Sequence, residues 1–235
     1  MTFAMLADPA ASRAAVFGAR GVIEGIKKGH AFVDSSTVDE ATGEDISAAV
    51  VAKSGRFLAA PVSGGWRDAV KGELLFIAGG DKSVFDEVTA EGGVMRSMGH
   101  KHWLVGESAK DAARAKLMLQ VLMGSFVAAT AETMALAQKA GLDQATLLDM
   151  FSNSAMANPI CSAKGKLMLS GDFAPNFQVY LQQKDLRLAL QLAEELEVPA
   201  PITAAANAQY IRAKQLGHSN SDFAAVRTSY DPPAA

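Results

Sequence analysis

The stretch HWLVGESAKDAARAKLMLQVLMGS, residues 102–125, carries a change of fold within this chain of 235 residues. Its first residues include an aromatic and a β-branched side chain and end in glycine, which predicts a strand over 102–106. From residue 107 onward apolar residues dominate at helical spacing, which predicts one long helix over 107–140. We therefore expect an α/β region before this point and a helical region after it.

Upstream of residue 102, short apolar runs alternate with helical patterns. The runs carry β-branched or aromatic residues, and the predicted strands are TFAML (2–6), AFVDS (31–35), RFLAAPV (56–62) and LLFIAGG (74–80). Helical spacing between the runs predicts helices over 38–53 and 81–97. Strands that alternate with helices are typical of parallel βα units in a layered sheet.

Downstream of residue 106 the sequence contains no convincing strand. Helices are predicted over 142–153, 159–169, 182–197 and 200–216. The end of the chain, TSYDPPAA (228–235), is expected to fray because two prolines and small residues cannot build a core.

Composition excludes several classes of protein. Apolar residues make up 49% of the chain, so a sizeable core can form. The net charge of −3 shows no basic bias, which argues against a nucleic-acid partner. No apolar run is expected to reach the roughly 18 residues of a membrane span. A single cysteine and four histidines fit a reducing intracellular compartment and predict no metal site.

Lys116 stands in a part of the long helix that is apolar on nearly every side. A buried lysine without a partner costs several kcal/mol, so burial there calls for a functional reason. Gln120 lies four residues further on, and therefore on the same face of the helix. The alternative is a lysine whose stem covers apolar surface while its ammonium group reaches water.

The loop DSSTVDE (34–40) follows a predicted strand and opens a predicted helix. Thr37 and Glu40 fit a capping box, with Ser36 as the alternative cap. The same hydroxyl groups lie where α/β sheets bind ligands, because free backbone N–H groups point there. Both interpretations remain open.

The loop APVSGG (60–65) also follows a predicted strand. Ser63, Gly64 and Gly65 would let the backbone approach a ligand closely, although ordinary loops have the same composition. Loops that follow parallel strands meet at one edge of the sheet, so we expect this loop and residues 35–37 at the same edge.

Two further patterns are informative. No G-x-G-x-x-G occurs, so the phosphate-binding turn of a dinucleotide fold is missing from these residues. Tyr180 and Lys184 have the spacing of the short-chain dehydrogenases, but without that glycine-rich loop the match is accidental. Lys184 and Asp185 would then pair with neighbours on the surface.

Several ordered segments resemble one family. They are FVDSSTVD, RFLAAPVSGG, AVKGELLFIAGG, AKLMLQVLMGSFVAATAE, QQKDLRLAL and PITAAANAQYIRAKQLGHSNSDFAAV. Together they look like the β-hydroxyacid dehydrogenases, which include 3-hydroxyisobutyrate dehydrogenase, and especially like the plant-type glyoxylate/succinic semialdehyde reductases. The resemblance implies an incomplete Rossmann-like parallel sheet over 1–106, an all-α 6-phosphogluconate-dehydrogenase-like domain over 107–228 and a tail over 229–235.

The resemblance also implies roles for individual residues. Lys116 falls on the catalytic lysine, and Gln120 falls where the family has an asparagine. The implied substrate-binding residues are Ser63, Gly64, Gly65, Thr37, Gln120 and Asp185. The implied cofactor-binding residues are Leu6, Ala7, Asp8, Thr37 and Lys184.

The implied reaction is the reduction of a small aldehyde or oxo acid, such as glyoxylate or succinic semialdehyde. NADPH, expected in preference to NADH, would deliver a hydride while Lys116 acts as general acid, and no metal is implied. A homo-oligomer formed through the helical domain is expected. The compartment stays open between cytoplasm, plastid and mitochondrion.

Three departures from the family pattern favour an alternative. The first βα units and the glycine-rich turn are expected to be absent, Gln120 is one methylene longer than asparagine, and Lys110 and Asp111 are expected to crowd the nicotinamide. The alternative is a truncated, catalytically inactive homologue that acts as a dimerising or binding protein.

Overall fold

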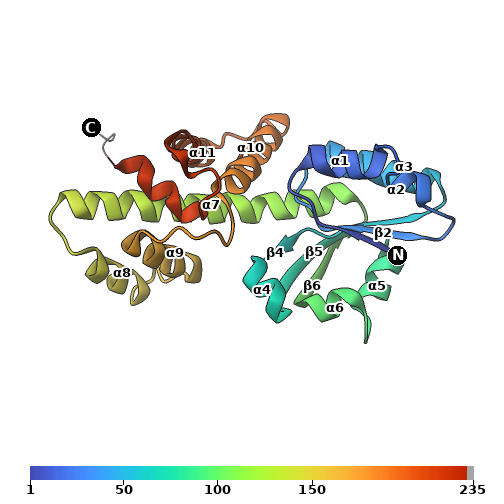
Figure 1. Cartoon of the computed structure of the whole chain (residues 1–235), viewed down its shortest axis with the longest axis horizontal. Helices are drawn as coiled ribbons and strands as arrows, with labels where there is room; N and C mark the ends of the chain where they lie inside the picture. Colours follow the sequence, from blue (N-terminus) through green and yellow to red (C-terminus); the bar gives the residue numbers. More distant parts are fainter. Residues whose placement is uncertain (232–235) are drawn as a thin grey trace. The chain divides into compact units, whose positions relative to one another are not determined.

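The structure is a computed structural model, and it describes residues 1–231. The chain divides into two compact units, Met1–Met118 and a second unit that begins at Leu119. One long helix, α7 (Ala109–Lys139), contributes residues to both units (Figure 1). Each unit is described separately below.

The first unit contains a six-stranded sheet. Its strands are β1 (Thr2–Ala4), β2 (Ala31–Asp34), β3 (Arg56–Ala59), β4 (Val62–Ser63), β5 (Leu74–Gly80) and β6 (Gly99–Gly106). Every strand predicted from the sequence is present, and β6 begins slightly earlier than expected.

The strand predicted over 56–62 is split into β3 and β4. Both halves pair with β5 in one continuous antiparallel register, with Leu58 opposite Gly80 and Ser63 opposite Leu75. Between the halves lies Pro61, which has no N–H to donate to the ladder. Its carbonyl oxygen still accepts a hydrogen bond of 2.9 Å from the Ile77 N–H, so the two halves follow one line across the sheet.

The sheet combines parallel and antiparallel pairs. The expected parallel pairs are β1–β2, β2–β3 and β5–β6. The antiparallel pairing of β3 and β4 with β5 was not expected. Only residues 64–73, which include helix α4 (Trp66–Lys71), join β4 to β5, and a parallel crossover needs about a dozen residues or more.

Helices cover both faces of this sheet (Figure 1). Besides α4 they are α1 (Pro9–Phe17), α2 (Val22–Gly25), α3 (Glu40–Ala52), α5 (Lys82–Thr89) and α6 (Val94–Met98). The single helix predicted over 81–97 is wrong, because the chain breaks between α5 and α6. Gly92 adopts a φ of 78° there, which a right-handed helix cannot contain.

Alternate residues of β2 and β3 supply two buried layers. Phe32 and Phe57 face one cluster, whose helical members include Ile46 of α3. Val33 and Leu58 belong to the opposite cluster, together with residues of α5 and α6. Strands that are buried on both faces read as continuous apolar runs, as the sequence showed.

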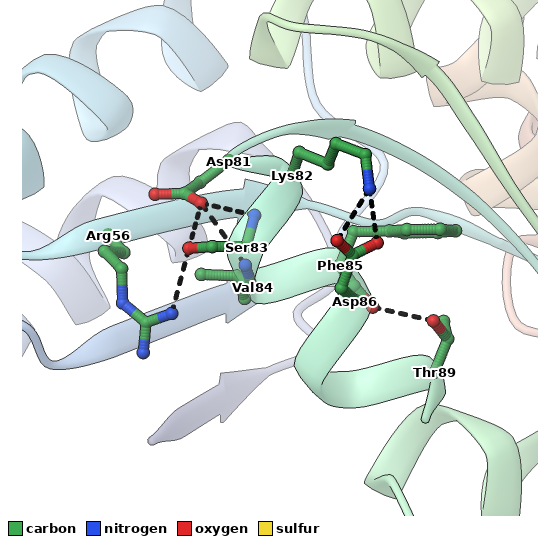
Figure 2. Close-up of polar contacts among 8 residues, drawn as sticks. All are labelled: Arg56, Asp81, Lys82, Ser83, Val84, Phe85, Asp86 and Thr89. Carbon is green, nitrogen blue, oxygen red and sulfur yellow. Dashed lines mark hydrogen bonds and ion pairs between the residues drawn. The ribbon is translucent and has the colours of Figure 1, made fainter. Parts of the chain in front are cut away.

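The start of α5 is tied to β3 by exposed polar groups (Figure 2). Asp81 caps the helix, since its Oδ1 accepts hydrogen bonds from the backbone N–H groups of Ser83 and Val84 at 2.8 and 3.2 Å. The Arg56 guanidinium donates to the Ser83 hydroxyl at 3.1 Å. These bonds fix where the helix begins.

The second unit is helical throughout its described part. After α7 come α8 (Gln144–Ser152), α9 (Pro159–Ser170), α10 (Val179–Glu195), α11 (Pro201–Ala213), a π-turn η1 (Lys214–His218) and a 3-10 helix η2 (Phe223–Tyr230). Residues 107–231 form no strand, as predicted. The core includes Val127, Met134, Leu186, Tyr210 and Phe223.

A buried ion pair holds the middle of this unit. Lys164 Nζ lies 2.9 and 2.8 Å from the two carboxylate oxygens of Asp222, and the two side chains are 6% and 0% exposed. Asp222 also accepts backbone N–H bonds from Asn176, Phe177 and Ala224. One carboxylate therefore joins α9, the loop before α10 and η2.

The predicted frayed tail is wrong for residues 228–231. Ser229 is buried within η2, and the Tyr230 hydroxyl donates to Glu132 at 3.2 Å. Arg227 forms an ion pair with Asp231 at 2.7 Å. These contacts anchor the segment to the helical core, and residues 232–235 lie outside the described residues.

The sequence was not expected to contain a segment long and apolar enough to span a membrane. Helix α7 could nevertheless cross one by its length and composition. However, 44% of its most apolar window is buried inside the protein, and core helices of ordinary folds pass the same test. This one helix is therefore weak evidence for a membrane span.

Candidate active site

Lys116 lies in a recess of the first unit. Lys116 is only 4% exposed, so the interpretation in which its ammonium group reaches bulk water is wrong. The recess is lined by Asp34, Ser36, Thr37, Val38, Gly43, Phe57, Ala59, Pro61, Ala109, Ala113 and Lys116. Its volume of about 10 Å³ gives room for about one water molecule. The recess is therefore a narrow space beside the lysine and not a chamber that encloses a ligand.

Two carboxylates of α3 hold the first turns of α7. Arg114 makes two parallel bonds to Glu40, with N···O distances of 2.6 and 2.9 Å. Glu44 accepts a hydrogen bond of 3.0 Å from the backbone N–H of Lys110. Paired guanidinium–carboxylate bonds restrict orientation as well as distance. They fix the helical turn that carries Lys116.

The segment before α7 is closed by a local cap. The Asp111 carboxylate accepts bonds from the Ser108 N–H and hydroxyl, at 3.1 and 2.8 Å, and these bonds hold the pKa of that carboxyl below its usual value. A Cβ at Gly106 would lie 2.1 Å from Asp111 Oδ2, so glycine is required there. The Asp111 side chain therefore folds back on its own helix.

The capping box predicted at Thr37 and Glu40 is wrong. Helix α3 begins at Glu40, and Asp39 caps it by accepting a bond of 2.8 Å from the Thr42 N–H. Asp39 therefore takes the capping role, and Ser36 and Thr37 lie before the cap, in the loop. Thr37 lines the Lys116 recess, as the ligand interpretation of this loop requires.

The loop of Leu6, Ala7 and Asp8 joins β1 to α1. Asp8 caps α1 by accepting a bond of 2.8 Å from the Ala11 N–H. The Leu6 N–H donates to the Ser36 hydroxyl at 2.9 Å. The loops after β1 and β2 therefore meet at the carboxyl ends of two parallel strands, the edge at which open α/β sheets bind ligands.

Ser63, Gly64 and Gly65 lie at a different hollow. Ser63 and Gly64 line a space of about 500 Å³ together with Asp68, Glu73, Leu75 and His100. Gly64 has a φ of 125°, which favours glycine, and the Gly65 N–H donates to Asp68 at 2.6 Å. None of the three residues lines the Lys116 recess.

Ala60 and Pro61 take the place that the sequence assigned to Ser63. The Ala60 N–H donates to the carbonyl oxygen of Asp34 at 2.8 Å, and Pro61 lines the recess. Ser63 lies further along the same strand line. The two loops therefore line different spaces, and the expectation that residues 35–37 and 63–65 lie at the same edge of the sheet stays a prediction.

The other predicted site residues form a buried cluster within the second unit. Gln120 and Asp185 are 2% and 1% exposed, and the Gln120 amide donates to Asp185 Oδ2. Lys184 Nζ lies 2.7 Å from Asp185 Oδ1. The surface interpretation of the Lys184–Asp185 pair is therefore wrong, since both side chains are withdrawn from water.

Asp34 is a recess residue that the sequence analysis did not select. It is 4% exposed and lies directly before the row Ser35, Ser36 and Thr37. The available signal was an acidic residue that ends an otherwise apolar strand. Burial raises the pKa of the Asp34 carboxyl, while hydrogen bonds from Ser36 partly oppose that rise.

The lining of the recess combines polar and apolar side chains. Thr37 and Lys116 carry polar groups, and Val38 and Pro61 are apolar. No group of three metal-binding side chains suited to a metal ion occurs among residues 1–231.

Comparison with known proteins agrees with this fold. Residues 1–106 match the family described as "NAD binding domain of 6-phosphogluconate dehydrogenase", and residues 111–230 match "NAD-binding of NADP-dependent 3-hydroxyisobutyrate dehydrogenase". The crystal structure of 3-hydroxyisobutyrate dehydrogenase from Salmonella typhimurium is similar, with a TM-score of 0.87 and 29% identity. That match covers 96% of this chain and 78% of the Salmonella chain.

Two curated relatives are each 40% identical to this chain. Glyoxylate/succinic semialdehyde reductase 1 of Arabidopsis thaliana matches over 96% of this chain and 76% of its own length. The cytokine-like nuclear factor N-PAC of Xenopus tropicalis matches over 98% of this chain but only 42% of its own length. The chain thus has a Rossmann-like NAD-binding domain and a helical C-terminal domain, and it belongs to the β-hydroxyacid dehydrogenase family, whose members depend on NAD(P).

Proposed function

We propose that this chain acts in the NADPH-dependent reduction of a small aldehyde or oxo acid, glyoxylate or succinic semialdehyde. The observation that carries the proposal is the burial of Lys116 beside Thr37 at the carboxyl ends of β2 and β3. A buried ammonium group can donate a proton to a carbonyl oxygen that is being reduced. The Arabidopsis reductase supports the choice of substrates.

The proposed chemistry assigns one proton transfer to the protein. When bound, NADPH supplies the hydride that reduces the aldehyde carbon. The electron pair of the carbonyl bond moves to oxygen, and that oxygen takes a proton from the Lys116 ammonium group, which becomes a neutral amine. General acid catalysis of this kind contributes about 10²–10⁴-fold to the rate. The hydrogen bonds that Arg114 donates to Glu40 support this proton transfer by fixing the helical turn that carries Lys116.

The remaining roles are proposed on the family resemblance. Ser63 and the backbone of Gly64 and Gly65 would bind the substrate carboxylate, and their position in an open hollow of about 500 Å³ leaves them accessible. Gln120 and Asp185 would contact the substrate. The proposed cofactor residues are Leu6, Ala7, Asp8, Thr37 and Lys184.

Replacement of the lysine tests the proposal. Lys116→Met keeps the length of the side chain and removes the proton donor. We expect turnover of NADPH with glyoxylate or succinic semialdehyde to fall by about 10²–10⁴-fold while the circular dichroism spectrum stays unchanged. The matched control is Lys110→Met, because Lys110 is an exposed lysine of the same helix. Equal turnover in Lys116→Met and the unaltered chain would remove Lys116 from the mechanism.

A second candidate function is a non-catalytic binding role. It is favoured by the N-PAC relative, whose name describes a nuclear factor and not an enzyme. Calorimetric titration of NADPH into residues 1–235 separates the two functions. Saturable NADPH binding followed by turnover supports the reductase, and the absence of both with either substrate supports the binding role.

We also propose that the chain forms a homo-oligomer through α7. Leu119, Leu122, Phe126 and Leu136 of this helix are 41–64% exposed and recur at the spacing of a helical stripe. Light scattering during size-exclusion chromatography tests this proposal. Leu122→Glu is expected to shift the assembly to a smaller species, whereas Leu169→Glu, on exposed apolar surface of α9, is not. An unaltered chain that elutes as a monomer contradicts it.

A further inference from the structure

Four polar residues are buried at the carboxyl ends of β1 and β2. Ser12 of α1 is 0% exposed, and Asp34, Ser35 and Ser36 are 3–4% exposed. Burying polar groups in an apolar surrounding is unfavourable unless they are hydrogen-bonded. The cluster therefore calls for a reason beyond the packing of the sheet.

Hydrogen bonds connect Asp34 to a loop that is distant in sequence. The Ser36 N–H donates to Asp34 Oδ1 at 2.9 Å. The Ser36 Oγ accepts a bond of 2.9 Å from the Leu6 N–H. These bonds form a relay in which the Asp34 carboxyl group holds the Ser36 backbone and the Ser36 hydroxyl holds the Leu6 backbone.

The relay touches both proposed cofactor loops. Leu6 begins the loop that continues through Ala7 and Asp8, and Ser36 directly precedes Thr37. Asp34 and Ser36 also line the recess that contains Thr37 and Lys116. A shift at Ser36 would therefore move backbone on both sides of the position proposed for the nicotinamide.

We propose that Asp34 and Ser36 are positioning residues that hold the Leu6–Asp8 loop and Thr37 in the arrangement that binds the nicotinamide cofactor. This inference rests on the proposed function. The two residues act through the backbone that they orient, so they affect cofactor affinity more than the proton transfer from Lys116.

The relay can be tested with neighbouring serines. Ser36→Ala removes the acceptor of the Leu6 N–H, and Ser36→Thr restores a hydroxyl. The matched control is Ser35→Ala, because the Ser35 hydroxyl is buried but has no hydrogen-bond partner within residues 1–231. Hydrogen–deuterium exchange of the Leu6 amide is measured without cofactor, and the NADPH dissociation constant is measured by titration.

Ser36→Ala is expected to speed exchange at Leu6 by about tenfold and to weaken NADPH binding by a similar factor, since one hydrogen bond is lost. Turnover at saturating NADPH should fall by a smaller factor than the NADPH affinity. Ser36→Thr should recover both properties, and Ser35→Ala should change neither.

Two results overturn the inference, and a third concerns the proposed function. Unchanged exchange at Leu6 in Ser36→Ala shows that the relay does not hold the loop. Faster exchange with unchanged NADPH affinity shows that the relay is structural only. Failure of the unaltered chain to bind NADPH refutes the proposed function before any variant is made. Thermal unfolding confirms that each variant is folded, and Asp34→Asn provides a second test of the relay.

Discussion

The ion pair between Lys164 and Asp222 leads to a quantitative prediction for stability. Lys164→Met keeps the aliphatic stem and removes the charge. Asp222, which is 0% exposed, would then lose its cation and keep the backbone N–H groups of Asn176, Phe177 and Ala224 as donors. The variant therefore leaves a buried carboxylate without its cation.

The expected loss is large for a single substitution. Breaking a buried ion pair by removing one partner costs about 3–5 kcal/mol. The three remaining N–H donors still solvate the carboxylate, so we expect Lys164→Met to lower the free energy of unfolding by about 3 kcal/mol. For a chain of this size each kcal/mol lowers the Tm by about 2–4 °C, so the expected drop is about 6–12 °C.

An exposed ion pair provides the control. Lys82 and Asp86 of α5 lie 2.6 Å apart, but their side chains are 71% and 58% exposed (Figure 2). Lys82→Met is expected to cost no more than about 0.5 kcal/mol, because water screens the pair. Thermal unfolding followed by circular dichroism measures both variants. If Lys164→Met lowers the Tm no more than Lys82→Met does, the assignment of a buried, energetically coupled pair is wrong.

Three further predictions concern other parts of the chain. Burial raises the pKa of Asp34, so its ionisation destabilises the folded state, and stability falls as pH rises above 3.8 through the folded pKa. The side chain in Asp34→Asn cannot ionise, so the Tm of this variant relative to the unaltered chain should be higher at neutral pH than at acidic pH. An equal Tm difference at the two pH values contradicts this prediction. Asn158→Ala removes the cap that accepts the Ile160 N–H at 2.9 Å and should cost about 1 kcal/mol in urea unfolding, whereas Asn158→Asp should cost little. Arg114→Met removes both bonds to Glu40 and should lower kcat for the proposed reduction without changing the Lys116 side chain; an unchanged kcat would show that the pair does not position α7.

Much of the fold could be predicted because its signals are local. The apolar runs of β2 and β5 and the helical pattern of α7 are properties of a few consecutive residues. The break between α5 and α6 was missed because apolar spacing continues across Gly92. The antiparallel pairing of β5 was missed because pairing direction is not written into the strand itself.

The residues of the candidate site also fall into those that the sequence could identify and those that it could not. Lys116 could be selected because an isolated charge in an apolar helix is visible in the sequence, and its burial is confirmed. Asp34 and Pro61 could not be selected, because only the folded sheet brings them to the recess with Lys116. Ser63 lines a different space from Thr37, a difference that the composition of the two loops does not encode.

The amino-acid order alone specified an α/β half followed by a helical half and the side chains able to do chemistry, because periodicity and residue type act over one or two turns. Folding settled which of those side chains share a space, which strand pairs are antiparallel and which polar groups lose contact with water. Those outcomes depend on contacts between residues far apart in the chain, such as the bond from Leu6 to Ser36, and a local pattern does not encode them.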